Sequence, residues 1–132
     1  MIETIEHTAD IRLRITAPTR EDLFREAVRG TIALLRPEKG ERKVQREVVV
    51  EAVDPTVLLI DFLNEALSNA HAQSEAYDDV IFLSFSDRRV TARFLGAQAT
   101  AFGADVKAVT YHEAEIRQNA NGEWSTVIVY DI

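Results

Sequence analysis

Strand-like patterns dominate the distribution of hydrophobic and polar residues along this chain. Apolar residues alternate with polar ones, or run together over a short stretch, as expected where successive side chains point to opposite faces of a sheet. These patterns predict strands over residues 9–15, 44–53, 81–94, 106–116 and 123–131. The stretch 81–94 contains two such runs separated by the turn sequence Ser-Asp-Arg-Arg, which predicts a hairpin.

Two further segments follow helical spacing. In the first, apolar residues recur on one side over residues 23–35, and Thr19 stands where its hydroxyl can cap the helix. The second begins with Asp54 followed by Pro55, which combines an N-cap residue with proline at the first helical position. An apolar stripe then extends over residues 59–70. The sequence therefore predicts two amphipathic helices.

The order of these elements predicts an α+β fold. Two helices would pack on a mostly antiparallel sheet and form a two-layer domain. A single domain over residues 1–132 is expected, because a chain of 132 residues with 46% hydrophobic residues can bury one core. The last strand, residues 123–131, has apolar residues on both faces, which predicts a position inside the sheet rather than at its edge.

Composition narrows the classes of function. The net charge is −7, and phosphate backbones are bound mainly through lysine and arginine, so direct binding of nucleic acid is not expected to be the main activity. The absence of cysteine excludes disulfides, a thiol nucleophile and a thiolate zinc site. No apolar run approaches the ~18 residues of a membrane span, and the N-terminus does not resemble a signal peptide, so we expect a cytoplasmic protein without membrane contact.

Acidic residues stand at the ends of two predicted strands. Asp10 precedes most of the first strand, and Asp131 with the carboxylate of Ile132 ends the last one. If these strands are antiparallel neighbours, three carboxylate groups converge, and their mutual repulsion favours a bound cation. Such oxygen ligands suit Ca²⁺ or Mg²⁺ rather than zinc. The alternative is that Asp10 caps a turn and Asp131 is a solvated strand end.

Histidines and nucleophiles give weaker signals of chemistry. His112 and Glu113 begin a zinc-protease motif, but position 116 holds isoleucine instead of the second histidine, and the segment is predicted to be a strand. His7 is either a metal ligand or hydrogen-bonded in a structural role near Asp10. The sequence has no nucleophile elbow, Walker loop or dinucleotide fingerprint.

Polar residues of the second helix and one lysine are open to two interpretations. Asp61, Asn64 and Glu65 lie on or near one polar helix face, which is either solvated or a partner surface. Lys107 stands beside apolar residues, where it could contact an anion or a partner, or extend along the surface to reach solvent.

Four short motifs together resemble the archease family. They are Glu-His-Thr-Ala-Asp at 6–10, Asp-Phe-Leu-Asn-Glu-Ala-Leu at 61–67, Val-Lys-Ala-Val-Thr-Tyr-His at 106–112 and Asp-Ile at 131–132. The resemblance implies a small acidic α+β protein that activates the GTP-dependent RNA ligase of tRNA splicing and RNA repair. Members promote guanylylation of the active-site histidine of the ligase, restore its turnover and broaden its nucleotide use, without joining RNA themselves.

The resemblance also implies candidate site residues. A divalent cation, with calcium first and magnesium or manganese as alternatives, would be bound by Asp10, Asp131 and Ile132. Candidate partner contacts in the matched motifs are His7, Asp61, Glu65 and Lys107. The chain departs from the family pattern at Phe62, where many relatives have tryptophan, and at residues 96–105, which lack an Asp-Pro-rich loop ending in histidine.

Three hypotheses of function follow from the residues and the resemblance. The leading one is an activator that docks on the RNA ligase near its nucleotide site and meets RNA only through the ligase. The second is a chaperone-like binding module that modulates nucleic-acid-processing proteins without a catalytic metal. The third is a stand-alone metal-dependent phosphohydrolase, which ranks last because the sequence supplies no convincing general base. The first two predict a protein that is not an enzyme.

Overall fold

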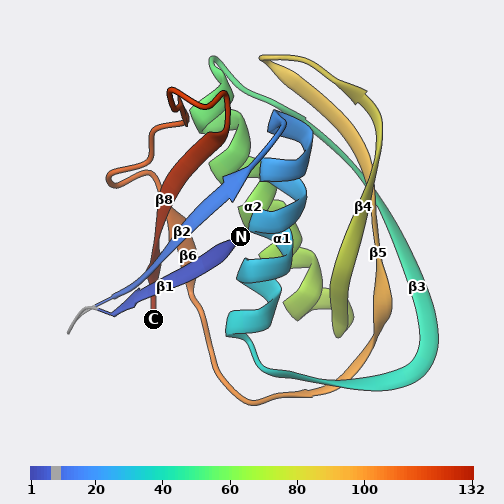
Figure 1. The fold of residues 1–132 in the computed structure, drawn as a ribbon. Helices are drawn as coiled ribbons and strands as arrows, with labels where there is room; N and C mark the ends of the chain where they lie inside the picture. The colour runs from blue at the N-terminus through green and yellow to red at the C-terminus, as the bar shows by residue number, and fades with distance from the viewer. Residues whose placement is uncertain (7–9) are drawn as a thin grey trace.

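Two antiparallel sheets enclose two helices in the computed structural model, which describes residues 1–6 and 10–132 (Figure 1). The first sheet has the spatial order β1 (Ile2–Glu6), β2 (Ile11–Ala17), β8 (Trp124–Asp131) and β6 (Ala108–Thr110), and β7 (Arg117–Gln118) also pairs with β8. The second sheet has the order β3 (Pro37–Glu51), β5 (Arg89–Phe102) and β4 (Glu75–Phe85). The helices are α1 (Arg20–Leu34) and α2 (Pro55–Gln73).

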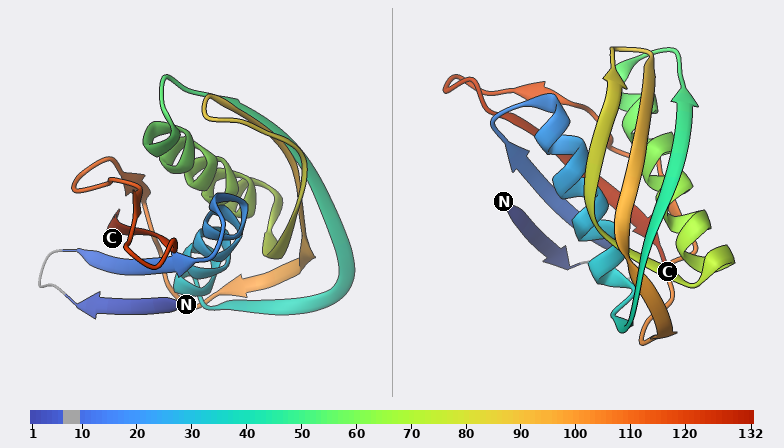
Figure 2. Two further views of the ribbon diagram at one scale, coloured as in Figure 1. Left: turned by 45° about the horizontal axis from the view of Figure 1, so that its top comes forward. Right: turned by 90° about the vertical axis from the view of Figure 1, so that its right-hand side faces the viewer.

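The helices lie between the sheets, so each helix is covered on more than one side (Figure 2). The predicted α+β class and the packing of two helices on antiparallel strands are confirmed; the difference is that the strands divide between two sheets. The physical reason is that α1 has buried residues facing both sheets, and a single sheet can cover only one side of a helix. Thr31 of this helix contacts Tyr130 in the first sheet, whereas the ring of Phe24 lies 4.9 Å from that of Phe85 in the second.

The predicted helix starts are confirmed by their capping contacts. The Thr19 hydroxyl accepts a hydrogen bond from the amide of Asp22 at 3.1 Å, and the Asp54 carboxylate accepts one from the amide of Val57 at 2.9 Å. Each contact satisfies one of the amides that a helix start leaves without a partner inside the helix. Within the described ranges, neither helix is long and apolar enough to cross a membrane.

The observed strand boundaries differ from those predicted from the sequence where bulges or short pairings interrupt the alternation of apolar and polar residues. Residues 37–43 and 96–102 lie outside the predicted strands, yet β3 and β5 extend through them, with register shifts on either side of Lys39. The predicted strand 106–116 is limited to β6, and residue 116 instead donates its amide to the Thr56 hydroxyl at 3.2 Å. A bulge interrupts the alternation of apolar and polar residues by which a strand is recognised in sequence. A turn that packs on the core can show the same alternation without being a strand.

The last strand lies inside the first sheet, as its two apolar faces predicted. It pairs with β2 on one side, where Ile11 faces Tyr130, and with β6 on the other, where Ala108 faces Asp131. The Tyr130 hydroxyl donates to the Thr31 hydroxyl oxygen at 2.7 Å, and Thr31 in turn donates to the carbonyl of Ala27 at 2.8 Å. This buried chain of hydrogen bonds fixes the end of β8 against α1.

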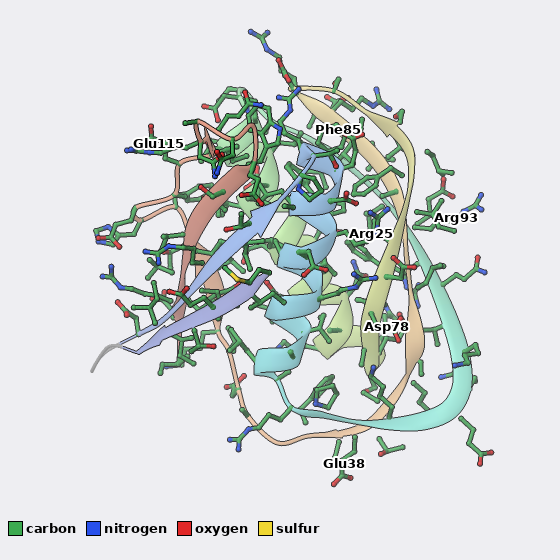
Figure 3. All side chains as sticks on the ribbon, in the orientation of Figure 1. Arg25, Glu38, Asp78, Phe85, Arg93 and Glu115 are labelled. Atoms are coloured by element: carbon green, nitrogen blue, oxygen red, sulfur yellow. The ribbon has the colours of Figure 1, made fainter. Side chains whose placement is uncertain are left out.

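Two arginines of α1 cover part of the free edge of the second sheet. One of them, Arg25, extends from α1 toward β4 (Figure 3). Arg25 donates to the carbonyl of Val80 at 3.2 and 3.3 Å, and Arg29 donates to the carbonyl of Asp78 at 2.7 Å. The Val80 amide is bonded at 2.8 Å by the side chain of Asp79. Unpaired edge groups invite pairing with another chain, so these contacts protect β4 from strand addition.

A buried carboxylate, Glu75, lies at the start of β4 and joins β4 to β3 within the second sheet. The residue is 4% exposed, and its carboxylate accepts two hydrogen bonds from Arg46, at 3.0 and 3.2 Å, and one from the Tyr77 hydroxyl at 2.6 Å. Burial by itself raises the pKa of Glu75, but the hydrogen bonds from Arg46 and Tyr77 outweigh it and leave the pKa below the ordinary value of 4.5.

Acid should therefore weaken the fold through Glu75. Because the pKa of Glu75 is lower in the folded protein than in the unfolded chain, the unfolded chain takes up the proton first on acidification. The stabilisation is complete above pH 4.5 and is lost as the pH falls through the folded-state pKa. Urea unfolding from neutral pH to about pH 3 measures this loss.

The Glu75→Gln variant provides the comparison. We expect it to be about 1–3 kcal/mol less stable than the wild type at neutral pH and to lose less stability on acidification. Glu47→Gln, on the exposed side of β3, is the control and should follow the wild-type pH profile. Identical pH profiles for wild type and Glu75→Gln would contradict the assignment.

Candidate functional site

The pairing of β2 with β8 brings two of the predicted acids together. The register places Ile11 opposite Tyr130, so Asp10, which precedes Ile11, and Asp131, which follows Tyr130, are neighbours across the two strands. Side chains two positions apart on a strand share a face, so both acids lie on the face of the sheet that carries Arg12 and Val129. The predicted antiparallel contact between the first alternating strand and the last strand is thus confirmed.

The third predicted ligand and the lysine of the matched motif lie at the same end of the sheet. Ile132 follows Asp131 directly, and the amide of Lys107 donates to the carbonyl of Asp131 at 2.8 Å. The side chains of Lys107, Asp131 and Ile132 are all exposed. Three of the four matched motifs therefore reach this end of the first sheet, where β2 begins, β8 ends and β6 begins.

The donor atoms gathered here fit an oxygen-preferring cation. Asp10 and Asp131 supply carboxylates and Ile132 supplies main-chain oxygen, which is the ligand type of Ca²⁺ and Mg²⁺. Among the described residues, no group of three or more His, Cys, Asp or Glu side chains is arranged to hold a metal ion. The predicted set contains only two such side chains, and its metal binding stays a prediction.

Arg12 is a residue of this site that sequence reasoning did not single out. Its Nε lies 3.5 Å from Oδ1 of Asp10, and its guanidinium also donates to the carboxylate of Glu113. The side chains of Arg12 and Asp10 are 20% and 19% exposed. The only sequence signal for this contact is that Arg12 and Asp10 share a face of the alternating strand, because Glu113 is 101 residues away.

The remaining candidate contacts are partly engaged within the molecule. His7 lies outside the described residues. Asp61 accepts a hydrogen bond from the Tyr111 hydroxyl, which raises the pKa of Tyr111 because the bond favours the protonated phenol. Glu65 is exposed, and its carbonyl accepts a hydrogen bond from Asn69 at 2.9 Å. Glu65 and Lys107 are therefore more accessible than Asp61 to a partner.

Asn64 does not belong to a solvated helix face. Its Nδ2 donates to the carbonyl of Val109 at 2.8 Å, and its Oδ1 accepts from the amide of Val109 at 2.9 Å. This pair of bonds satisfies the edge of β6 that does not face β8, and it joins the second matched motif to the third. Helical periodicity marks Asn64 as polar but cannot show that a strand edge lies opposite it.

Comparisons with known proteins agree with these motifs. The family model described as "Archease protein family (MTH1598/TM1083)" matches residues 2–132. A curated relative named Protein archease, from Pyrococcus abyssi, is 33% identical over 147 residues, which cover 98% of this chain and 97% of that protein. Another, from Methanosarcina barkeri, is 29% identical over 144 residues, covering 98% of this chain and 94% of that protein.

Two solved structures share the fold. The crystal structure of an archease from Thermotoga maritima, described as a possible chaperone, has a TM-score of 0.72 at 20% identity and covers 100% of this chain and 98% of its own. The solution structure of protein 1598 from Methanobacterium thermoautotrophicum has a TM-score of 0.72 at 22% identity, with coverages of 99% and 98%. At these identities the likeness shows the arrangement of helices and strands.

Proposed function

The chain belongs to the archease family, and from this premise we propose that it is an accessory activator of the GTP-dependent RNA ligase of tRNA splicing and RNA repair. The match over residues 2–132 supports the proposal, because all four motifs lie within it. In this role the protein promotes guanylylation and repeated turnover of the ligase and catalyses no joining itself. It meets RNA only through the ligase.

The observation that carries the proposal is the meeting of Asp10, Asp131 and Ile132 at one end of the first sheet. These residues would hold a divalent cation, calcium first, with magnesium or manganese as alternatives. When bound near a nucleotide, such a cation offsets negative charge on phosphate oxygens. The chain itself contributes position, since the pairing of β8 with β2 and β6 holds the acids, and the exposure of Asp131 and Ile132 leaves them accessible to a partner.

Charge favours a protein partner over direct contact with RNA. The net charge of −7 opposes phosphate backbones, and several arginines of the first sheet are neutralised by acids. Arg14 pairs with Glu3 at 2.9 Å, and Arg117 pairs with Glu115 at 2.7 Å. The exposed side chains of Lys107 and Glu65 are the proposed contacts with the ligase, together with His7 and Asp61.

Ligase turnover tests the proposal directly. GTP-dependent RNA joining and the covalent ligase–nucleotide adduct are measured with and without this protein, after the protein has been treated with chelator and re-supplied with Ca²⁺, Mg²⁺ or Mn²⁺. We expect repeated turnover only when the protein is present, and a smaller effect from chelator-treated protein. Equal turnover of the ligase in the presence and absence of the protein would reject the proposal.

A chaperone-like role is the second candidate, because the Thermotoga maritima relative is described as a possible chaperone. In that case the protein would bind several unrelated nucleic-acid-processing proteins, and chelator treatment would not change the binding. Pull-down with the RNA ligase and with unrelated enzymes, each in the presence and absence of chelator, separates the two functions.

A further inference from the structure

Arg12 stands between two acids, and only one of them belongs to the candidate cation site. We propose that Arg12 is a positioning residue that competes with the divalent cation for Asp10, an inference that rests on the proposed function. Glu113 limits this competition by binding the guanidinium of Arg12. The pair would thereby set the affinity of the site. Neither Arg12 nor Glu113 is among the predicted ligands.

The contacts of Arg12 are unequal. Its Nε lies 3.5 Å from the Asp10 carboxylate, at the limit of a hydrogen bond, whereas its Nη1 donates a close hydrogen bond to the Glu113 carboxylate. The side chain of Arg12 is 20% exposed and that of Glu113 is 44% exposed. Because Arg12 and Asp10 are largely shielded from solvent, their charges interact more strongly than those of a fully exposed pair.

The backbone of Glu113 adds an independent observation. Its φ is 59°, in the left-handed region that residues other than glycine rarely adopt. The other described non-glycine residues with positive φ, Arg36 and Ser74, follow the ends of α1 and α2, where this conformation is common. Glu113 lies instead in a turn closed by the amide of Ala114 and the carbonyl of Tyr111 at 3.2 Å. Glycine would make this turn with less strain, but it would leave Arg12 without the acceptor that the Glu113 carboxylate provides.

Electrostatics gives each residue an opposite effect on cation affinity. A cation bound by Asp10 and Asp131 has the same sign of charge as the guanidinium next to it, so Arg12 weakens binding. Glu113 offsets that charge and keeps Arg12 from moving fully onto Asp10, so Glu113 strengthens binding. A merely structural ion pair would give no such opposition, because the loss of either partner would disturb the same contact.

Calorimetric titration with CaCl₂ and with MnCl₂ tests the proposal on the intact chain. We expect Arg12→Met to bind the cation about tenfold more tightly than wild type and Glu113→Gln to bind it about three- to tenfold more weakly. Arg12→Lys, which keeps the charge, should return toward the wild-type affinity. Arg14→Met is the matched control, because Arg14 lies on the same face of β2 but pairs with Glu3. The affinity of Arg14→Met for the cation should differ less from the wild-type affinity than that of Arg12→Met.

Each outcome separates this inference from the proposed function. If the wild type binds the cation and Asp131→Asn does not, the cation site is supported. If Arg12→Met and Arg14→Met then bind with the same affinity, the proposed role of Arg12 is overturned. Binding by Arg12→Met but not by wild type supports the competition in its strongest form. If neither protein binds a cation, both the site and the inference are rejected. Circular dichroism of each variant checks that the fold is kept.

Discussion

If the proposed function holds, replacing Asp131 by alanine is expected to reduce the proposed activation of the RNA ligase at least about tenfold while leaving the fold intact. The side chain is exposed, and the main-chain bonds of this residue with β6 do not depend on it, since the carbonyl of Asp131 accepts from the Lys107 amide. Alanine therefore removes one proposed cation ligand and little else. Formation of the ligase–nucleotide adduct over time, at a fixed ratio of the two proteins, measures the loss.

Asp131 is a cleaner target than Asp10 for this experiment. Asp10 contacts Arg12, so its removal changes the charge balance around the guanidinium as well as the donor set. Asp78→Ala is the control, because Asp78 is an exposed acid on the second sheet, in a surface contact with Lys39 at 3.5 Å. Full activation by Asp131→Ala, with an unchanged melting temperature, would contradict cation binding at this position as the basis of the activity.

Local signals in the sequence predicted the helices and the meeting of two candidate acids. Thr19 and Asp54 cap their helices through contacts within three residues, so their role is visible in sequence. The interior position of β8 followed from its two apolar faces, and the meeting of Asp10 with Asp131 followed from pairing β8 with the strand that Asp10 precedes. These inferences need only the period of a strand and the direction of its neighbour.

Contacts between distant segments were not predictable in the same way. The division into two sheets depends on which strands pack on each side of the helices. The apolar character of Phe24 predicts that it is buried, but not that it contacts Phe85 in the second sheet. The bond between Arg12 and Glu113 joins positions 101 residues apart. Helical spacing predicts Asn64 on or near a polar face of the second helix. Its side chain is hydrogen-bonded, but to the main chain of Val109.

Replacing Asn64 by alanine is expected to destabilise the protein by about 3 kcal/mol. The substitution removes both hydrogen bonds to Val109, a residue that is only 3% exposed, and leaves its amide and carbonyl without a protein partner. Each buried main-chain group left unsatisfied costs about 1–3 kcal/mol. Asn64→Asp should fall between alanine and wild type, because it keeps an acceptor for the Val109 amide but places a second oxygen opposite the Val109 carbonyl. Urea unfolding measures both changes.

The same substitution should loosen the candidate site, because Asn64 holds β6 and β6 holds the end of β8. Hydrogen exchange should become faster at the Lys107 amide, which is bonded to Asp131, and at the Val109 amide. Asn69→Ala is the matched control on α2, since Asn69 bonds the carbonyl of Glu65 within its own helix; we expect it to change stability by less than about 0.5 kcal/mol. If Asn64→Ala and Asn69→Ala proved equally stable and exchanged alike at Lys107, the bond to Val109 would not be what keeps β6 in register beside Asp131.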